Sequence, residues 1–251
     1  MPPVDPLNLP SRLPSRIRSM MRGTGLPLLL AGILAAALWH GRLRAEEGAV
    51  LVPAPVLDEP MAPGPARIAV LSGGCFWGVQ GVFEHVKGVE KVWAGYAGGD
   101  KESANYELVS TGTTGHAESV QITFDPAAIT YGQILRIFFS VAHDPTELDR
   151  QGPDEGSQYR SAIFYGDADQ QRIAQAYIDQ LNKSGVFAKA IATRLDPLKG
   201  FYPAEAYHQD FLVNNPSYPY ILINDMPKLE SLKRLFPDFY RDDPITTVGA
   251  S

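Results

Sequence analysis

The sequence has 251 residues, of which 45% are hydrophobic and 20% are charged, and this composition excludes a wholly disordered chain and a collagen-like repeat. Its 22 basic and 28 acidic residues give a net charge of −6, which argues against a nucleic-acid partner. Cys75 is the single cysteine, so an internal disulfide, a cysteine-rich zinc site and an iron–sulfur cluster are excluded as well.

Residues 1–45 have the parts of an export signal. Four arginines before residue 23 precede an uncharged apolar stretch from Gly23 to Trp39, which contains the small residues Ala35–Ala37. An uncleaved membrane anchor is the alternative, because the stretch extends to Gly41 and approaches the length that spans a bilayer. We expect an exported protein, periplasmic or anchored facing the periplasm; without a working signal it would be cytoplasmic.

Residues 46–66 are rich in alanine and proline, and this predicts a semi-extended linker before the core. In the core, residues 67–71 predict a short buried strand that Ser72-Gly73-Gly74 ends. From Cys75 onward apolar residues recur every three or four positions, which predicts a helix. Strands are expected over 89–96 and 119–125, the second with clear alternation of apolar and polar residues.

The second half of the core begins with a predicted helix over 131–141, followed by a long polar segment that we expect to be a functional loop. A strand is expected over 161–165. A helix then follows from Asp167, with Gln170 completing a capping box and Gly185 ending it. This order predicts an α+β catalytic domain over 67–245, with a ferredoxin-like βαββαβ core and a wrapping C-terminal segment.

Cys75 follows two glycines and starts a predicted helix. The glycines allow a tight turn, and the free N–H groups of a helix start favour a thiolate, so we expect a lowered pKa and a reactive sulfur. Glu118 has the same parity as the buried side of its strand, which would raise its pKa and suit a proton donor. His116 could pair with Cys75 as nucleophile and base. The histidines do not form a ligand-spaced cluster, so no metal site is expected.

Several segments in register carry a resemblance to a known family. They are Gly74-Cys75-Phe76-Trp77-Gly78, Gly95–Gly99, Asn105-Tyr106, Thr114–Glu118, His143-Asp144-Pro145, Arg150–Asp154 and Gln158–Ile163. Their order and spacing resemble the A-type methionine sulfoxide reductases, the peptide-methionine (S)-S-oxide reductases. The similarity covers roughly Arg67 to Arg241, which is essentially the whole core.

The resemblance implies a set of roles. Cys75 would attack the sulfoxide sulfur, and Glu118 would protonate the sulfoxide oxygen with the help of the Tyr106 and Tyr159 hydroxyls. Asp154 would lie near the site and act in the thiol step. The substrate-binding residues would be Phe76 and Trp77, which hold the ε-methyl group, together with Gly74 and His116. Because a thiolate and a carboxylate repel each other, we expect Cys75 and Glu118 to share one proton, with Glu118 protonated.

This chain lacks the second cysteine with which many members of that family close an internal disulfide, and so it resembles the single-cysteine branch. No bound cofactor is expected. A sulfenic acid on Cys75 would be resolved by an external thiol, from thioredoxin or from glutathione with glutaredoxin. The expected partners are oxidised proteins that carry methionine sulfoxide and a thioredoxin-like reductant, and we expect a monomer with a possible membrane tether at its N-terminus.

The residues alone leave three other hypotheses about the function open. Cys75, His116 and an aspartate could form a cysteine hydrolase or acyltransferase, which would need no reductant. A membrane-tethered module could bind methionine sulfoxide through Phe76 and Trp77 without turnover. Cys75 could also be a buried structural residue that reacts slowly with alkylating agents.

Overall fold

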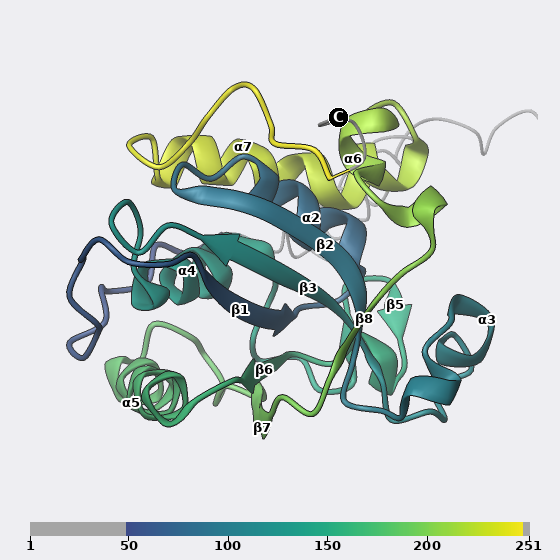
Figure 1. The fold of residues 1–251 in the computed structure, drawn as a ribbon, viewed down its shortest axis with the longest axis horizontal. Coiled ribbons are helices and arrows are strands. Elements are labelled where there is room, and N and C mark those ends of the chain that lie inside the picture. Colours follow the sequence, from purple (N-terminus) through teal and green to yellow (C-terminus); the bar gives the residue numbers. More distant parts are fainter. Residues whose placement is uncertain (1–48, 248–251) are drawn as a thin grey trace, which may run out of the picture. The chain divides into compact units, whose positions relative to one another are not determined.

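The computed structural model describes residues 49–247, and their centre is a six-stranded sheet (Figure 1). Its strands are β1 (Arg67–Ser72), β2 (Val89–Ala97), β3 (Ala117–Phe124), β6 (Ala162–Tyr165), β7 (Arg194–Pro197) and β8 (Phe201–Pro203). They lie in the order β7-β6-β1-β3-β2-β8, and every neighbouring pair is antiparallel except β6 with β7. The mixture of this sheet with helices confirms the predicted α+β class.

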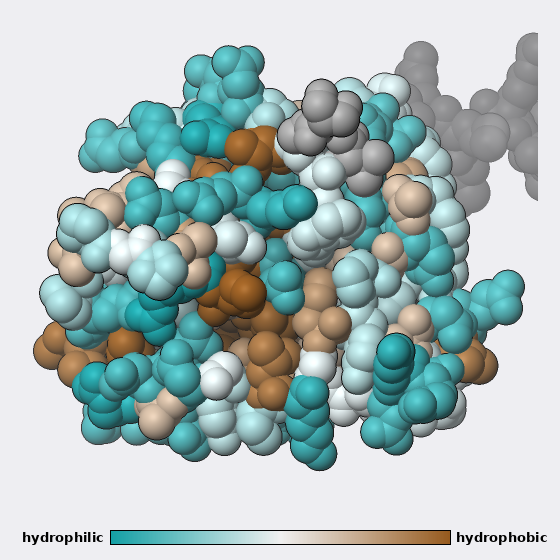
Figure 2. Space-filling model, in the orientation of Figure 1, coloured by the Kyte–Doolittle hydropathy of each residue, from teal (hydrophilic) through white to brown (hydrophobic). Residues whose placement is uncertain are grey.

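The helices are α2 (Phe76–Glu84), α3 (Tyr106–Val109), α4 (Tyr131–Ile137), α5 (Ala168–Ser184), α6 (Phe211–Asn214) and α7 (Met226–Leu235). The main core lies between one face of the sheet and these helices, and it includes Val120, Ile122 and Phe124 of β3, all fully buried. A smaller apolar cluster around Val70 and Phe164 covers the other face. On the face that Figure 2 shows, hydrophilic side chains dominate and apolar ones gather near the middle, over β1 and β6.

Capping residues fix the ends of α5 as the sequence predicts. The Asp167 side chain accepts the Gln170 N–H at 2.8 Å, and Gly185 closes the helix in the left-handed conformation. The capping box is incomplete, because the Gln170 side chain accepts the Gly166 N–H instead of the Asp167 N–H. The predicted helix over 131–141 is also divided: α4 ends at Ile137, and a π-helical turn, η2 (Phe138–Ala142), continues it.

The polar segment between η2 and β6 is ordered by short elements. They are the paired strands β4 (Arg150–Gln151) and β5 (Asp154–Glu155) and the 3₁₀ turn η3 (Ser157–Tyr159). The remaining turns are η1 (Lys101–Ser103), η4 (Ala206–His208) and the π-helical η5 (Ile221–Asp225). The C-terminal part wraps the core as expected, since β8 pairs with β2 and α7 packs on α2.

Residues 49–66 contain no helix or strand, but they pack on the core and do not span free space as the predicted linker would. Val52 is fully buried, and its N–H donates to Ser140 Oγ at 3.2 Å. Asp58 and Glu59 accept hydrogen bonds from the N-terminal N–H groups of α4, at 2.9 and 3.0 Å. The predicted boundary at residue 67 therefore separates no independent unit among the described residues.

The predicted export signal lies outside the residues that the structure describes. Within 49–247, no helix is both long and apolar enough to cross a membrane.

Candidate functional site

The turn between β1 and α2 places Cys75 at the start of a helix. Gly74 has a φ of +88°, and a Cβ there would lie 2.6 Å from the side chain of Gln151. Cys75 is the N-cap residue of α2 and is partly exposed. Gly74 thus serves the turn and the close approach of the β4 segment, and it does not line the cavity in front of the thiol.

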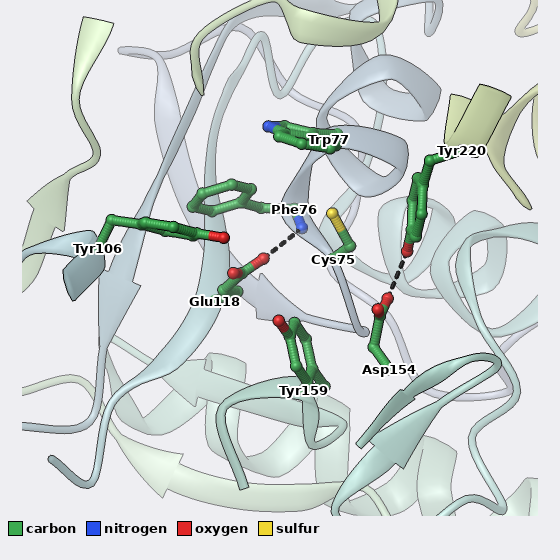
Figure 3. A pocket seen from close by; sticks show the side chains of 8 residues that line it. All are labelled: Cys75, Phe76, Trp77, Tyr106, Glu118, Asp154, Tyr159 and Tyr220. Atoms are coloured by element: carbon green, nitrogen blue, oxygen red, sulfur yellow. Dashed lines mark hydrogen bonds between the residues drawn. The ribbon is translucent and has the colours of Figure 1, made fainter. Parts of the chain in front are cut away.

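That cavity has a volume of about 180 Å³ and brings together residues from α2, α3, β3, β5, η3 and the C-terminal part (Figure 3). It is lined by Cys75, Phe76, Trp77, Tyr106, Glu118, Asp154, Tyr159 and Tyr220. Glu118 and Tyr106 lie on one side of the thiol, the pair of Asp154 and Tyr220 lies on the other, and Tyr159 faces it from below in the view of Figure 3. Seven of the nine residues named from the sequence therefore meet at one cavity.

Glu118 projects from β3 on the face that packs against α2, as its parity predicted, and is only 4% exposed. Its Oε2 accepts the N–H of Phe76 at 3.0 Å, which ties the carboxyl to the first turn of α2. Burial raises the pKa of Glu118 to about 8, with the Phe76 N–H acting in the opposite direction and Asp154 adding to the rise. The carboxyl is consequently protonated at neutral pH and can give up a proton to a bound substrate.

The pKa of Cys75 contradicts the sequence-based expectation of a lowered value. Desolvation raises the pKa of the thiol well above its usual range, and the carboxylates of Glu118 and Asp225 add to the rise. The backbone N–H of Trp77, in the first turn of α2, lowers the pKa of the thiol, as expected of a helix N-terminus. This effect is smaller than the rise that desolvation causes. The resting site therefore holds one proton on the sulfur and one on Glu118, and not a single shared proton.

Two tyrosine hydroxyls complete the polar side of the cavity. Desolvation, and then the charge of Glu118, raises the pKa of Tyr106 and of Tyr159. Both hydroxyls keep their protons at neutral pH and can donate hydrogen bonds to an oxygen that lies beside Glu118.

Tyr220 is a cavity residue that the sequence did not indicate. It precedes η5, and its hydroxyl donates a hydrogen bond to Oδ2 of Asp154 across 66 positions of sequence. Tyr220 is one of several tyrosines in a segment rich in tyrosine and proline, and its sequence neighbours carry no signal for this contact. The hydrogen bond fixes Asp154 on the side of the thiol opposite Glu118 (Figure 3).

Phe76 and Trp77 form the apolar wall. Phe76 is almost fully buried, with its ring centroid 5.9 Å from that of Tyr96. Trp77 stacks on Phe211 at 3.9 Å, and its indole N–H donates to Nδ1 of His208 at 3.2 Å. These contacts hold the indole in one orientation, so the wall exists before a substrate binds.

His116 lies away from the cavity lining, in contrast to its predicted role in binding substrate or activating Cys75. Its Nδ1 accepts the Gly99 N–H at 3.2 Å, and its Nε2 lies 2.9 Å from the carbonyl oxygen of Asp100. Because a carbonyl can only accept, Nε2 carries the proton, and both ring nitrogens are occupied. The ring has no nitrogen left to take a proton from Cys75. The described residues also contain no group of three metal-binding side chains.

Comparisons with known proteins agree on one family. The family model described as "Peptide methionine sulfoxide reductase" matches residues 67–238. The "Peptide methionine sulfoxide reductase MsrA 2" of Mesorhizobium japonicum is 57% identical over 195 residues, which cover 78% of this chain and all of that protein. A "Peptide methionine sulfoxide reductase MsrA" of Thermus thermophilus is 48% identical over 177 residues, or 70% of this chain and 99% of that protein.

Two solved structures resemble the fold. Mxr1 from Saccharomyces cerevisiae in its reduced form has a TM-score of 0.55 and 32% identity, and the match covers 65% of this chain and 92% of that one. Methionine sulfoxide reductase A of Corynebacterium diphtheriae has a TM-score of 0.54 and 31% identity, and the match covers 71% of this chain and 94% of that one.

Proposed function

The chain belongs to the peptide methionine sulfoxide reductase family, and from that premise we propose how its cavity reduces methionine sulfoxide with one cysteine. The reaction is the thiol-dependent reduction of methionine sulfoxide in oxidised proteins to methionine. The observation that carries the proposal is the meeting of a lone thiol, Cys75, with a carboxyl of pKa about 8, Glu118, in one cavity with an apolar wall.

Substrate binding uses the two chemically different sides of the cavity. The ε-methyl group of the substrate packs against Phe76 and Trp77, and the sulfoxide oxygen faces Glu118, Tyr106 and Tyr159. In this orientation the sulfur of the substrate is presented to Cys75, and the three donors surround the atom on which negative charge develops. The preference for the S epimer is carried over from the family.

The chemical step transfers one oxygen atom. The sulfur of Cys75 attacks the sulfoxide sulfur while Glu118 gives its proton to the oxygen, and the thiol proton replaces the one that Glu118 has lost. When the oxygen has passed to Cys75, methionine leaves and Cys75 is a sulfenic acid. Cys75 is oxidised by two electrons and the substrate is reduced by two, so atoms, protons and electrons balance.

Regeneration requires thiols from outside the chain, because its 251 residues contain no second cysteine. A first external thiol condenses with the sulfenic acid, which releases water and leaves a mixed disulfide on Cys75. A second thiol attacks the sulfur of the first, which joins the two external thiols in a disulfide and releases Cys75 as a thiol. Thioredoxin, or glutathione with glutaredoxin, is the proposed source. Asp154, held by Tyr220 on the side of the thiol opposite Glu118, would guide this step (Figure 3).

The occupied nitrogens of His116 count against the hydrolase alternative, which needs that ring as a base for Cys75. The wild type and the Cys75→Ser variant together test the binding-module alternative, which predicts that both bind the peptide and that neither forms methionine. A reductase variant Cys75→Ser should bind a methionine-S-sulfoxide peptide and form no methionine, while the wild type should need added thiol for more than one turnover. Repeated turnover without thiol would contradict the proposed route.

Other proposals concern the whole chain. We assign the four strands β6-β1-β3-β2, all antiparallel, to a ferredoxin-like core, with β7 and β8 as additions. The apolar stretch before residue 40 supports export to the periplasm with a cleaved signal or a membrane tether. Cell fractionation followed by mass spectrometry of the mature N-terminus tests this assignment, and gel filtration tests the proposed monomer.

A further inference from the structure

We propose that Arg160 and His116 are positioning residues that set the spacing of the three proton-bearing side chains of the cavity, Tyr106, Glu118 and Tyr159. The inference rests on the proposed function, because it concerns the alignment of those donors. Arg160 and His116 do not line the cavity themselves. Their hydrogen bonds connect the three chain segments that carry Tyr106, Glu118 and Tyr159.

The guanidinium of Arg160 binds three backbone carbonyls. Its Nη1 donates to the carbonyl oxygens of Ser157 at 2.7 Å and of His116 at 3.1 Å, and its Nη2 donates to that of Gly115 at 2.8 Å. The residue is only 5% exposed. Nε of this guanidinium is buried without a hydrogen-bond partner, so the bonds from Nη1 and Nη2 to the three carbonyls are what stabilise the buried charge and hold it in one geometry.

The three carbonyls belong to the segments of two cavity residues. Gly115 and His116 lead into β3, in which Glu118 is the second residue, and Ser157 begins η3, which ends at Tyr159. The planar fork of Arg160 therefore fixes the start of β3 relative to η3. Space for the fork depends on a glycine, because a Cβ on Gly98 would lie 2.8 Å from Nη2 of Arg160.

The ring of His116 forms hydrogen bonds to the segment that leads to Tyr106. Through Gly99 and Asp100 it holds the loop that follows β2, and a Cβ on Gly99 would lie 2.5 Å from the ring. This loop runs through η1 to α3, which begins at Tyr106. The backbone of His116 is bound by Arg160 and its ring by the Gly99 loop, so this one residue connects the segments of Tyr106, Glu118 and Tyr159.

The first test is Arg160→Lys, which keeps the charge but loses the fork that reaches three carbonyls. We expect the single-turnover rate on a methionine-S-sulfoxide peptide to fall roughly tenfold to 100-fold, the usual effect of a donor displaced by about an ångström. In the Tyr159→Phe background the further loss should be at least about threefold smaller, because coupled residues are not additive. Equal losses in both backgrounds, with both variants folded, would overturn the role of Arg160.

A matched control is Arg136→Lys. Arg136 is a half-buried arginine that donates to the carbonyl of Val52 at 3.0 Å, away from the cavity. Its substitution should lower the melting temperature and leave the single-turnover rate unchanged. A rate loss in this control as large as that of Arg160→Lys would show that general loosening of the fold, and not positioning, causes the effect.

The second test is independent of whether Arg160→Lys folds. His116→Phe removes both ring hydrogen bonds, and His116→Gln restores a donor and an acceptor. We expect His116→Phe to slow the reaction non-additively with Tyr106→Phe, His116→Gln to recover part of the rate, and alkylation of Cys75 to be unchanged in both. Loss of alkylation in His116→Phe would instead identify His116 as a base and overturn its positioning role.

The two proposals fail in different ways. If the wild-type chain forms no methionine, the proposed function is wrong. If the wild type is active and Glu118→Gln is slow, but folded Arg160→Lys and His116→Phe react at the wild-type rate, only the positioning role is wrong.

Discussion

The substitution Glu118→Gln removes the transferable proton from the cavity and keeps a side chain of nearly the same size. A glutamine amide can still accept the Phe76 N–H and donate a hydrogen bond to the sulfoxide oxygen. It cannot transfer a proton. We therefore expect the variant to bind substrate and to fail at the chemical step.

The magnitude follows from the pKa of Glu118. At a pKa of about 8 the carboxyl is roughly 90% protonated at pH 7, whereas at the ordinary value of 4.5 it would be about 0.3% protonated. Burial thus increases the amount of the acid form about 300-fold. General acids contribute roughly 10²- to 10⁴-fold to a rate, and we expect the single-turnover rate of Glu118→Gln to fall within that range.

The assay is rapid-quench measurement of methionine formed from a sulfoxide peptide, with enzyme in excess and no reductant. The control is Glu84→Gln: Glu84 is also buried with a pKa raised to about 10, but it does not line the cavity, and its substitution should leave the rate unchanged. A folded Glu118→Gln variant that reacts within about twofold of the wild type would refute the acid role, since the loss expected of a general acid is far larger.

Three further substitutions address binding, packing and pH. Trp77→Leu removes the ring that stacks on Phe211 and should raise KM about tenfold, the effect of losing roughly 1.4 kcal/mol of apolar contact; an unchanged KM in steady-state assays would exclude this wall from binding. Asp58→Ala removes a cap of α4 and should lower the free energy of unfolding in urea by about 1–2 kcal/mol without changing the single-turnover rate; no loss of stability would mean that residues 49–66 contribute little. Because the raised pKa values of Glu84 and Glu118 mean that the folded chain binds more protons than the unfolded one, stability should fall as the pH rises from 5 to 8. Glu84→Gln should flatten that fall in thermal melts, and an unaltered slope would contradict the raised pKa of Glu84.

Local patterns in the sequence predict the strands β1, β2, β3 and β6, the helices α2, α4 and α5, and the buried side of β3. Alternation around Val120 places Glu118 on the face toward α2, and Asp167 and Gly185 mark the ends of α5. These features depend on residues close in sequence, and so they can be read without the fold. The same is true of the turn before Cys75, where Gly74 has a positive φ.

Features that depend on distant residues could not be predicted in this way. The hydrogen bond of Tyr220 to Asp154 joins segments that meet only in the fold. The raised pKa of Cys75 reflects burial by the assembled cavity, which outweighs the local effect of the helix start. The packing of residues 49–66 depends on the buried Val52 and on the N-terminus of α4, although their composition alone indicates a linker. The two bonds that occupy the ring of His116 are likewise visible only in the structure.

The most direct test of the account is a single turnover of the full chain with a methionine-S-sulfoxide peptide and no added thiol, followed by mass spectrometry of Cys75. We predict one methionine per enzyme, a Cys75 that has gained one oxygen atom, and renewed turnover when thioredoxin and its reductase are added. No methionine and an unmodified Cys75 would contradict the account.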